Sequence, residues 1–306
     1  MSCRILNIAD EQEWIKSAQW LKNRDEPDPE VEKSVQAIIS RVREEGDDAL
    51  VDFCRQYDCP DFEPPLLVSR HDIALAAASV SVESREQISA AAANIRAFHQ
   101  AQVEQSWFIT RPDGSILGQR VVPVDSVGLY VPGGKGGNTP LISSLLMNAI
   151  PAQVAGVQRI AICTPPRKDG TLNPYILAAA HLLDIDEVYR VGGAWSIAAL
   201  CYGTSSIKKT DVIAGPGNIH VATAKRLLQG IVGIDMVAGP SEVLIIADSS
   251  ANPAWVAADM LSQAEHDVLA SSICITDDAK LAEQTGKELE KQLKDLPRAG
   301  IARASL

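Results

Sequence analysis

The chain has 306 residues, of which 46% are hydrophobic and 22% are charged, the balance of a globular protein with length enough for two ordinary domains. Lys and Arg number 28 against 39 Asp and Glu, which gives a formal net charge of −11, and no basic run interrupts this acidic excess. Such a chain repels phosphate backbones and anionic lipid headgroups, so we expect no nucleic-acid partner. The longest apolar runs are strand-length, far short of the roughly 20 residues of a membrane span, so we expect no membrane partner.

The amino terminus and the cysteines predict where the protein resides. Residues 1–12 include Arg4, Asp10 and Glu11 and lack the apolar core and cleavage site of a secretory signal. The six cysteines are scattered, without the spacing of a disulfide framework or of a paired CxxC zinc site. Reduced thiols in a reducing compartment are the simplest interpretation, so we expect a cytoplasmic protein.

Helical periodicity dominates the first third of the chain. Between residues 30 and 57 apolar residues recur at steps of three and four, and Gly46 interrupts this stripe, which predicts two helices or one broken helix. A proline-rich linker over 59–65 precedes a further predicted helix over 82–102. Residues 107–118 predict a hairpin with a Pro-Asp-Gly turn.

Six short apolar runs then follow, most of them separated by segments with helical character. They span residues 127–131, 159–163, 187–191, 212–214, 243–247 and 272–276. Alternating strands and helices imply parallel strands joined by right-handed crossovers. Helix start signals agree, with Pro140 before 141–155 and Asn252-Pro253 before 254–266. We therefore predict an α/β fold with a parallel sheet, preceded by a helical N-terminal region.

Three loops rich in Gly and Pro lie directly after predicted strands. They read Val131-Pro-Gly-Gly-Lys-Gly-Gly-Asn138, Ala214-Gly-Pro-Gly-Asn218 and Ala238-Gly-Pro-Ser241-Glu242. Ligands of parallel sheets bind at the carboxyl ends of the strands, and glycine lets them approach the backbone, so we interpret these loops as a ligand crevice. The alternative for any one loop is a tight turn.

Two named phosphate-binding motifs are excluded in these loops. Lys135 has Leu129 where a P-loop requires its first glycine, and no Ser or Thr follows it. The fingerprint GxGxxG is absent because His220 stands where its third glycine is required after Gly215 and Gly217. A nucleotide would therefore have to bind through a different loop.

The segment 254–266 contains the clearest candidate for chemistry. As a helix of about 100° per residue, it places Asp259, Ser262, Gln263 and His266 within little more than one quadrant, opposite its apolar residues. Gln263 and His266 are one turn apart and can reach the same point, and imidazole is a common zinc ligand. The alternative is the solvated face of an amphipathic helix, which spacing alone favours.

Other potentially reactive side chains are expected to be structural. The remaining histidines are His71, His99, His181 and His220. Cys163 and Cys201 lie among hydrophobic neighbours with no histidine nearby in sequence, which predicts buried thiols and no cysteine nucleophile.

Five sequence strings, in order, resemble the histidinol dehydrogenase family. They are Ser126-Val-Gly-Leu-Tyr-Val-Pro-Gly-Gly134, Leu146-Met-Asn-Ala-Ile-Pro-Ala152, Ala214-Gly-Pro-Gly-Asn218, Asp235-Met-Val-Ala-Gly-Pro-Ser-Glu-Val243 and Leu261-Ser-Gln-Ala-Glu-His-Asp267. The similarity runs from about Val31 to the end of the chain. Five motifs in the family's order are far more specific than any single glycine loop.

The resemblance implies a fold, an activity and cofactors. The fold is a set of Rossmann-like parallel-sheet domains of the histidinol/aldehyde dehydrogenase-like type, incomplete in lacking GxGxxG. The activity is the zinc-dependent oxidation of L-histidinol through L-histidinal to L-histidine, the last steps of histidine biosynthesis, with two NAD molecules in succession. The family is homodimeric.

The resemblance also implies roles for five residues. Tyr130 and Asn218 match contacts to NAD, Ser241 matches a substrate contact, and Gln263 and His266 match both zinc ligands and substrate contacts. The polar face of 254–266 thus coincides with the family's metal site. Zinc there would hold the substrate and orient its alcohol, a template role without electron transfer.

Two departures from the family pattern stand out. Trp195 occupies a position where the family usually has a glutamine that contacts NAD, which leaves contact by that side chain in question. The family chain also continues past Leu306 with a Glu-His acid/base pair, an Asp zinc ligand and a His zinc ligand from the other subunit. We therefore expect no catalytic acid/base pair in this sequence and an inactive fragment as written.

Two alternative functions remain open at this point: a related zinc/NAD alcohol dehydrogenase acting on another small alcohol, and a noncatalytic binding module. The family pattern also predicts domain limits. It assigns 1–128 to a helical N-terminal region and the first part of domain one, 129–242 to a Rossmann-like NAD-side domain, and 243–306 to the return to domain one, with the metal helix.

Overall fold

The structure is a computed structural model that describes residues 3–22, 28–134, 140–237 and 242–306. Two compact units divide the chain, one comprising residues 28–237 and the other 1–27 together with 238–306. Residues 28–128 therefore group with 129–237, because helices of the first stretch cover the sheet of the second, whereas the family pattern places a limit at 129. No helix within the described ranges combines the length and apolar character needed to cross a membrane.

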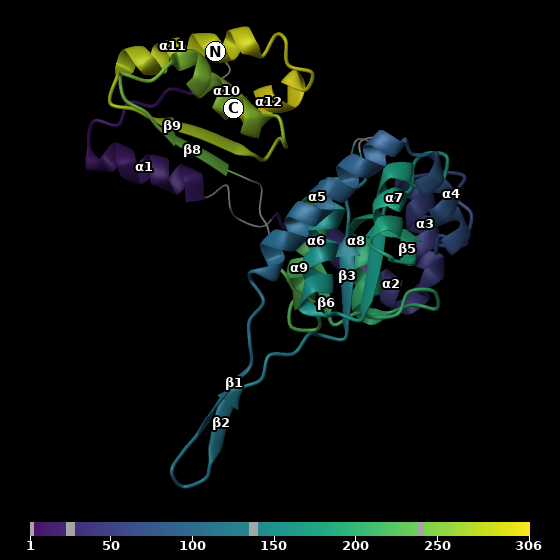
Figure 1. Ribbon diagram of the computed structural model, residues 1–306. Helices are drawn as coiled ribbons and strands as arrows, with labels where there is room; N and C mark the ends of the chain where they lie inside the picture. Colours follow the sequence, from purple (N-terminus) through teal and green to yellow (C-terminus); the bar gives the residue numbers. More distant parts are fainter. Residues whose placement is uncertain (1–2, 23–27, 135–139, 238–241) are drawn as a thin grey trace. The chain divides into compact units, whose positions relative to one another are not determined.

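A parallel five-stranded sheet forms the centre of the unit 28–237, in the order β5-β4-β3-β6-β7 (Figure 1). Its strands are β3 (Ser126–Tyr130), β4 (Arg159–Thr164), β5 (Glu187–Arg190), β6 (Val212–Ala214) and β7 (Gly233–Ile234). The first four confirm the predicted strands to within one residue. The chain runs outward from β3 through β4 to β5 and then crosses back to place β6 on the other side of β3. This reversal creates a topological switch point between β3 and β6, the place where open α/β sheets bind ligands at the carboxyl ends of their strands.

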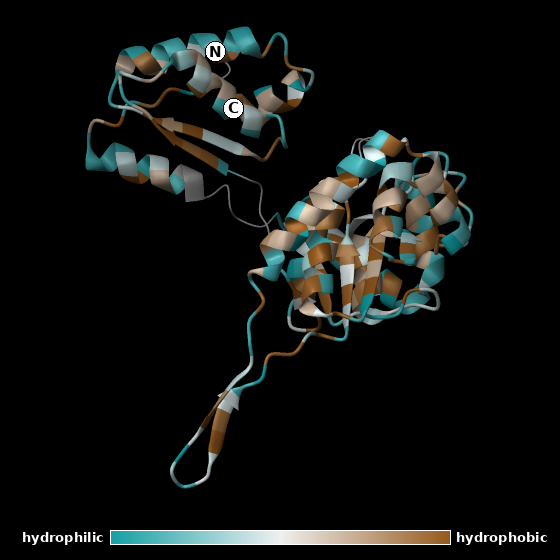
Figure 2. Cartoon of the chain, in the orientation of Figure 1, coloured by the Kyte–Doolittle hydropathy of each residue, from teal (hydrophilic) through white to brown (hydrophobic). Residues whose placement is uncertain are grey.

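Helices cover both faces of this sheet because side chains alternate between the faces along each buried strand. One face is covered by α2 (Pro29–Glu45), α3 (Asp47–Tyr57), α8 (Gly193–Tyr202) and α9 (Ile219–Leu228), and the other by α4 (Arg70–Ser79), α5 (Val82–Gln100), α6 (Ile142–Ala155) and α7 (Pro174–Leu182). Tyr130 and Cys163 belong to the first core cluster, whereas Leu129 and Ile162 belong to the second. Figure 2 shows the apolar residues gathered in the strands and on the helices around them.

Local signals start and stop the helices of the first third. Asp28 caps α2, since its side chain accepts a hydrogen bond from the Glu30 N–H at 2.9 Å. Gly46 separates α2 from α3 with a φ of 61°, a conformation that favours glycine. The prediction of two helices between 30 and 57 is therefore confirmed, and α5 confirms the helix predicted over 82–102.

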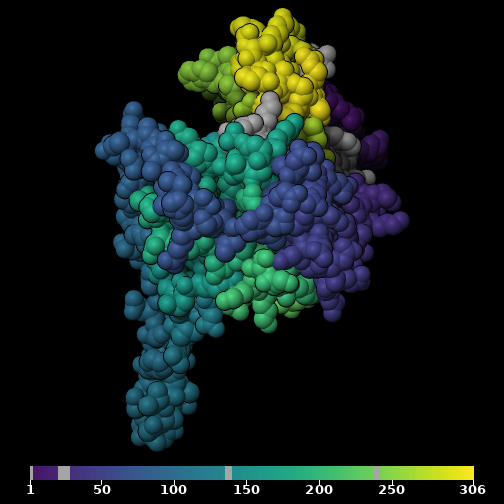
Figure 3. Space-filling view, turned by 90° about the vertical axis from the view of Figure 1, so that its right-hand side faces the viewer, coloured from purple at the N-terminus to yellow at the C-terminus, as the bar shows by residue number. Residues whose placement is uncertain are grey.

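The predicted hairpin is confirmed as β1 (Trp107–Thr110) and β2 (Ile116–Gln119), which pair antiparallel with each other. It extends as an arm from the rest of its unit (Figures 1 and 3). Every residue of both strands is exposed, including Phe108 at 62% and Ile116 at 67%. A two-stranded sheet has too little core of its own to be stable in water, so these apolar side chains need a further surface.

The unit formed by the two chain ends holds a two-stranded parallel sheet joined by a helix. Its elements are α1 (Glu11–Lys22), β8 (Glu242–Ile246), α10 (Pro253–Ala264), β9 (Ser271–Ile275), α11 (Ala279–Gln292) and α12 (Ala299–Ser305). The last two predicted strands are thus confirmed to within one residue. The core packs Val256 and Met260 of α10 against Leu289 and Leu293.

Candidate functional site

The loop after β6 lies against the end of β3 at the topological switch point. Gly215, with a φ of 125°, approaches the strand so closely that a Cβ atom at this position would lie 2.1 Å from the Tyr130 carbonyl oxygen. Gly217 is similarly confined, because a Cβ atom there would lie 2.3 Å from Val221 Cγ1. Gly215 therefore packs directly on the backbone of β3, and a residue with a side chain would fit at neither position.

Asn218 ends this loop and caps the amino terminus of α9. Its Oδ1 accepts a hydrogen bond from the Val221 N–H at 3.1 Å, and the residue is exposed. The carboxamide nitrogen keeps its own N–H donors, and the first turn of α9 favours negative charge nearby. This end of the loop suits a phosphate or ribose group.

Tyr130 is the last residue of β3, and its side chain is only 5% exposed. Burial raises the pKa of the phenol, and a hydrogen bond from the Gly193 backbone opposes this effect only in part. The phenol is therefore neutral at physiological pH and can donate a hydrogen bond. The backbone of Tyr130 thus lies against the loop that ends at Asn218, and its side chain belongs to the core cluster that includes residues of α8.

The loop of residues 214–218 is also hydrogen-bonded to an ion pair that the sequence analysis did not predict. Lys225 of α9 is 2% exposed, and its Nζ lies 2.5 Å from Asp235 Oδ1. Lys225 Nζ also donates to the Gly215 carbonyl oxygen, and the Gly215 N–H donates to Asp235 Oδ2, both at 2.9 Å. One feature of the sequence could have indicated this ion pair: Lys225 falls on the apolar stripe of α9, together with Val221 and Leu228.

Trp195, where the resemblance implies a glutamine in the family, lies in the first turn of α8 and is 7% exposed. Its ring stacks on Phe53, with centroids 5.4 Å apart, and on Tyr57, with centroids 5.3 Å apart. The side chain therefore packs α8 against α3.

The predicted metal helix is α10, but α10 ends at Ala264, so the prediction of a continuous helix over 254–266 is wrong by two residues. His266 lies in the following turn, where its N–H donates to the Gln263 carbonyl oxygen at 3.1 Å. The Asp267 side chain accepts from the Leu269 N–H at 2.9 Å and so stabilises the turn in place of a further helical turn.

The division of α10 into a polar and an apolar face is confirmed. Asp259, Ser262 and His266 are exposed and Gln263 is half-buried, whereas Met260, Leu261 and Ala264 are buried. Gln263 lies in the last turn of α10, and His266 lies in the turn directly after it. An imidazole nitrogen and a carboxamide oxygen are both groups that can bind a divalent cation.

Two side chains are fewer than a zinc site requires. Zinc in proteins usually has about four ligands, and the described part of the chain contains no group of three or more His, Cys, Asp and Glu side chains that could hold a metal. The donor types therefore fit zinc, and their number falls short. Ser241, the predicted substrate contact, lies outside the described residues.

The buried cysteines are unsuited to nucleophilic chemistry. Burial raises the pKa of the Cys163 thiol, and it raises the pKa of Cys54 to about 12 and that of Cys201 to about 11. The reactive thiolate is therefore scarce at neutral pH. This result agrees with the prediction of structural thiols.

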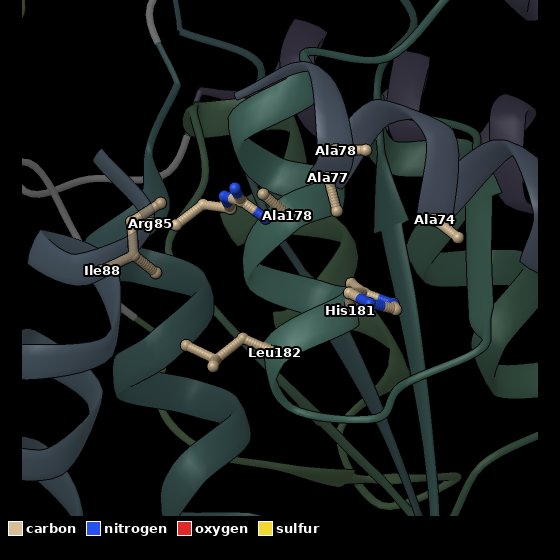
Figure 4. Close-up of a pocket in the computed structure, with 8 residues that line it drawn as sticks. All are labelled: Ala74, Ala77, Ala78, Arg85, Ile88, Ala178, His181 and Leu182. Atoms are coloured by element: carbon tan, nitrogen blue, oxygen red, sulfur yellow. The ribbon is translucent and has the colours of Figure 1, made fainter. Parts of the chain in front are cut away.

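A cavity in the helical layer of the unit 28–237 lies between α4, α5 and α7 (Figure 4). It is lined by Ala74, Ala77, Ala78, Arg85, Ile88, Ala178, His181 and Leu182. Four of these residues are alanines, and the lining contains no carboxylate or thiol. His181 is its one lining side chain suited to acid/base or metal chemistry, and it has no carboxylate or thiol partner there, so the switch point is the better candidate.

The fold and the glycine loops define a class: α/β proteins that bind a nucleotide-like ligand at the carboxyl ends of a parallel sheet. A family model described as histidinol dehydrogenase matches residues 21–306. The chain therefore belongs to the histidinol dehydrogenase family, whose members are NAD-dependent oxidoreductases of histidine biosynthesis. This finding confirms the resemblance seen in the sequence.

Individual relatives agree with the family model. The chain is 60% identical to the histidinol dehydrogenase of Oleidesulfovibrio alaskensis, with 100% of this chain and 71% of the relative covered. It is 59% identical to that of Nitratidesulfovibrio vulgaris, with coverages of 100% and 70%. A crystal structure of histidinol dehydrogenase from Elizabethkingia anophelis superposes with a TM-score of 0.78 at 38% identity, over 99% of this chain and 65% of that one. The chain thus spans about two thirds of the length of these proteins.

Proposed function

We propose that this chain carries the cofactor-binding part and a portion of the metal site of an enzyme that oxidises L-histidinol through L-histidinal to L-histidine. The observation that supports this most directly is the meeting of Tyr130 with the glycine loop that ends at Asn218, at the switch point of the sheet. Family membership supports the substrate.

In this proposal Tyr130 and Asn218 bind and orient NAD. NAD, when bound, supplies the hydride acceptor for both oxidation steps. The loop that ends at Asn218 lies against the end of β3, and the first turn of α9 favours the phosphates of the dinucleotide. Tyr130 is neutral and largely buried, so it orients the cofactor without adding charge.

We assign Gln263 and His266 to zinc and to the substrate, and Ser241 to the substrate. Zinc, when bound, supplies a Lewis acid that holds the substrate and orients its alcohol. His266, exposed beyond the end of α10, and Gln263, half-buried within it, would donate part of the ligand set. The acid/base pair used by the family is assigned to no residue of this sequence.

The activity is tested with a family-length protein that contains this sequence. We expect L-histidinol to reduce two NAD molecules for each L-histidine formed, and removal of zinc with a chelator to abolish the reaction. NADH absorbance and amino-acid analysis measure both products. Reduction of NAD by other small alcohols but not by L-histidinol would contradict the substrate assignment, and NAD binding without turnover would indicate a binding module.

We also propose a cytoplasmic homodimer in which a second copy covers the β1–β2 hairpin. All six cysteines are free thiols, which suits a reducing compartment. The hairpin exposes apolar residues on an arm without a core of its own, and Ile116 is 67% exposed. These side chains are available for an interface.

Ile116→Glu in the family-length protein is expected to weaken the dimer by at least about 100-fold, because a carboxylate would be buried in an apolar interface. Sedimentation velocity over a concentration series measures the dissociation constant. Ile231→Glu is the matched control, because Ile231 is 61% exposed and lies outside the hairpin. Equal dimer stability in the two variants would exclude the hairpin from the interface.

A further inference from the structure

We infer that the ion pair between Lys225 and Asp235 is a positioning device for the cofactor, which holds the loop of residues 214–218 in its binding conformation. The inference rests on the proposed function, because it assumes that this loop contacts NAD. Neither side chain is assigned a contact with NAD, zinc or substrate. Their proposed effect is exerted through the backbone of Gly215.

The N–H and the carbonyl group of Gly215 are each hydrogen-bonded to one member of the Lys225–Asp235 ion pair. Lys225 Nζ donates to the Gly215 carbonyl oxygen at 2.9 Å, while Asp235 Oδ2 accepts from the Gly215 N–H at 2.9 Å. The two side chains also contact each other directly, with Lys225 Nζ 2.5 Å from Asp235 Oδ1. Rotation of either peptide group at Gly215 would break a charge-assisted hydrogen bond, so the φ of 125° is held from both sides.

Gly215 lies between Tyr130 and Asn218, the two proposed cofactor contacts. We call the ion pair and its two hydrogen bonds to Gly215 the clamp. Gly215 approaches the Tyr130 backbone on one side, and the loop reaches Asn218 three residues later on the other. Because Asn218 is also the cap of α9 and Lys225 lies two turns further along that helix, the clamp fixes helix and loop as one piece. A small change at Gly215 would therefore move Asn218 relative to Tyr130.

Stability alone is a poor explanation for a lysine in this place. Lys225 is 2% exposed and shares its helix face with Val221, Ala224 and Leu228, where an apolar residue would pack without a desolvation cost. Replacing a buried charge and its partner by apolar groups is often neutral or stabilising, and here the lysine is buried while the Asp235 side chain is 30% exposed. An ion pair whose two side chains both bond to one glycine backbone is better explained by the geometry that it specifies.

A second ion pair of the same unit provides a matched control. Arg159 Nη2 lies 2.8 Å from Glu187 Oε2, and both side chains are partly buried. Arg159 also donates to the carbonyl oxygens of Lys208 and Lys209. Arg159 and Glu187 are the first residues of β4 and β5, so this pair lies at the amino ends of the strands, away from the switch point.

The experiment compares Lys225→Met and Lys225→Arg with Arg159→Met in the family-length protein. Direct titration measures the dissociation constant for NAD, steady-state kinetics measure KM for NAD and for L-histidinol, and thermal unfolding measures stability. We expect Lys225→Met to raise KM and Kd for NAD by about tenfold or more, with KM for L-histidinol changed by less than about twofold. Lys225→Arg should recover part of the NAD affinity, and Arg159→Met should lower Tm without changing NAD affinity.

Unchanged NAD affinity in Lys225→Met, or an equal loss in Arg159→Met, would overturn the inference. Should Lys225→Met fail to fold, Asp235→Asn takes its place, because the carboxamide oxygen can still accept from the Gly215 N–H while the charge is lost. A folded Asp235→Asn with wild-type NAD affinity would also overturn the inference. Absence of L-histidinol oxidation in the wild type would contradict the proposed function, while the NAD titrations would still test the clamp.

Discussion

A family-length protein carrying His266→Ala is expected to lose its zinc and about 1,000-fold of its L-histidinol oxidation while keeping its fold. Removing an imidazole ligand leaves zinc with an incomplete ligand set, and the Lewis acid contributes several kcal/mol to the transition state. The fold should persist because His266 is exposed beyond the end of α10. The contact from Arg298 Nη2 is to the His266 backbone oxygen, at 3.0 Å, which alanine retains.

Zinc per protomer after gel filtration, together with thermal unfolding, measures this result. His71→Ala is the matched control, because His71 is also exposed but lies in α4, on the helical layer of the other unit. We expect His71→Ala to keep both zinc and activity. A full zinc complement in His266→Ala would remove His266 from the metal site, whatever happens to the activity.

Gly215→Ala is expected to lower the free energy of unfolding of the unit 28–237 by more than about 3 kcal/mol. A methyl group there would lie 2.1 Å from the Tyr130 carbonyl oxygen, a backbone atom that cannot move without disturbing β3. The φ of 125° is itself outside the range that alanine readily adopts. Urea unfolding followed by circular dichroism measures the loss, and NAD affinity should fall with it.

Gly230→Ala separates these two causes. Gly230 also has a positive φ, of 94°, but no atom lies within 4 Å of the position that its Cβ would occupy. Only the backbone cost should remain, about 1–2 kcal/mol. The difference between the two variants then measures the close approach of Gly215 to β3. Equal losses would contradict that close approach.

Local patterns were sufficient to predict most of the elements. The break at Gly46, the hairpin at 107–118 and the strands from 127 onward depend on residues close in sequence: a glycine, a Pro-Asp-Gly turn and short apolar runs. The end of α10 was missed because Asp267 caps a turn that competes with helix continuation, and periodicity carries no information on such competition.

The candidate site was predictable only in part. The glycine loops and the polar face of α10 could be recognised from residue types and spacing, and the resemblance to the family assigned roles to Tyr130, Asn218, Gln263 and His266. The packing of Trp195 between Phe53 and Tyr57 could not be seen, because the partners are far away along the chain.

The amino-acid sequence by itself determined the α/β class, the limits of the strands and helices that it predicted to within a few residues, and the family; α1, α4 and β7 were among the elements that it did not predict. These properties depend on side-chain period and on local caps, which act over a few residues. The tertiary structure alone decided that β6 lies beside β3, that Gly215 therefore touches Tyr130, and that Lys225 and Asp235 hold that glycine between them. Strand order and the position of Gly215 depend on contacts between segments that are distant in sequence, and only the packed core selects among them.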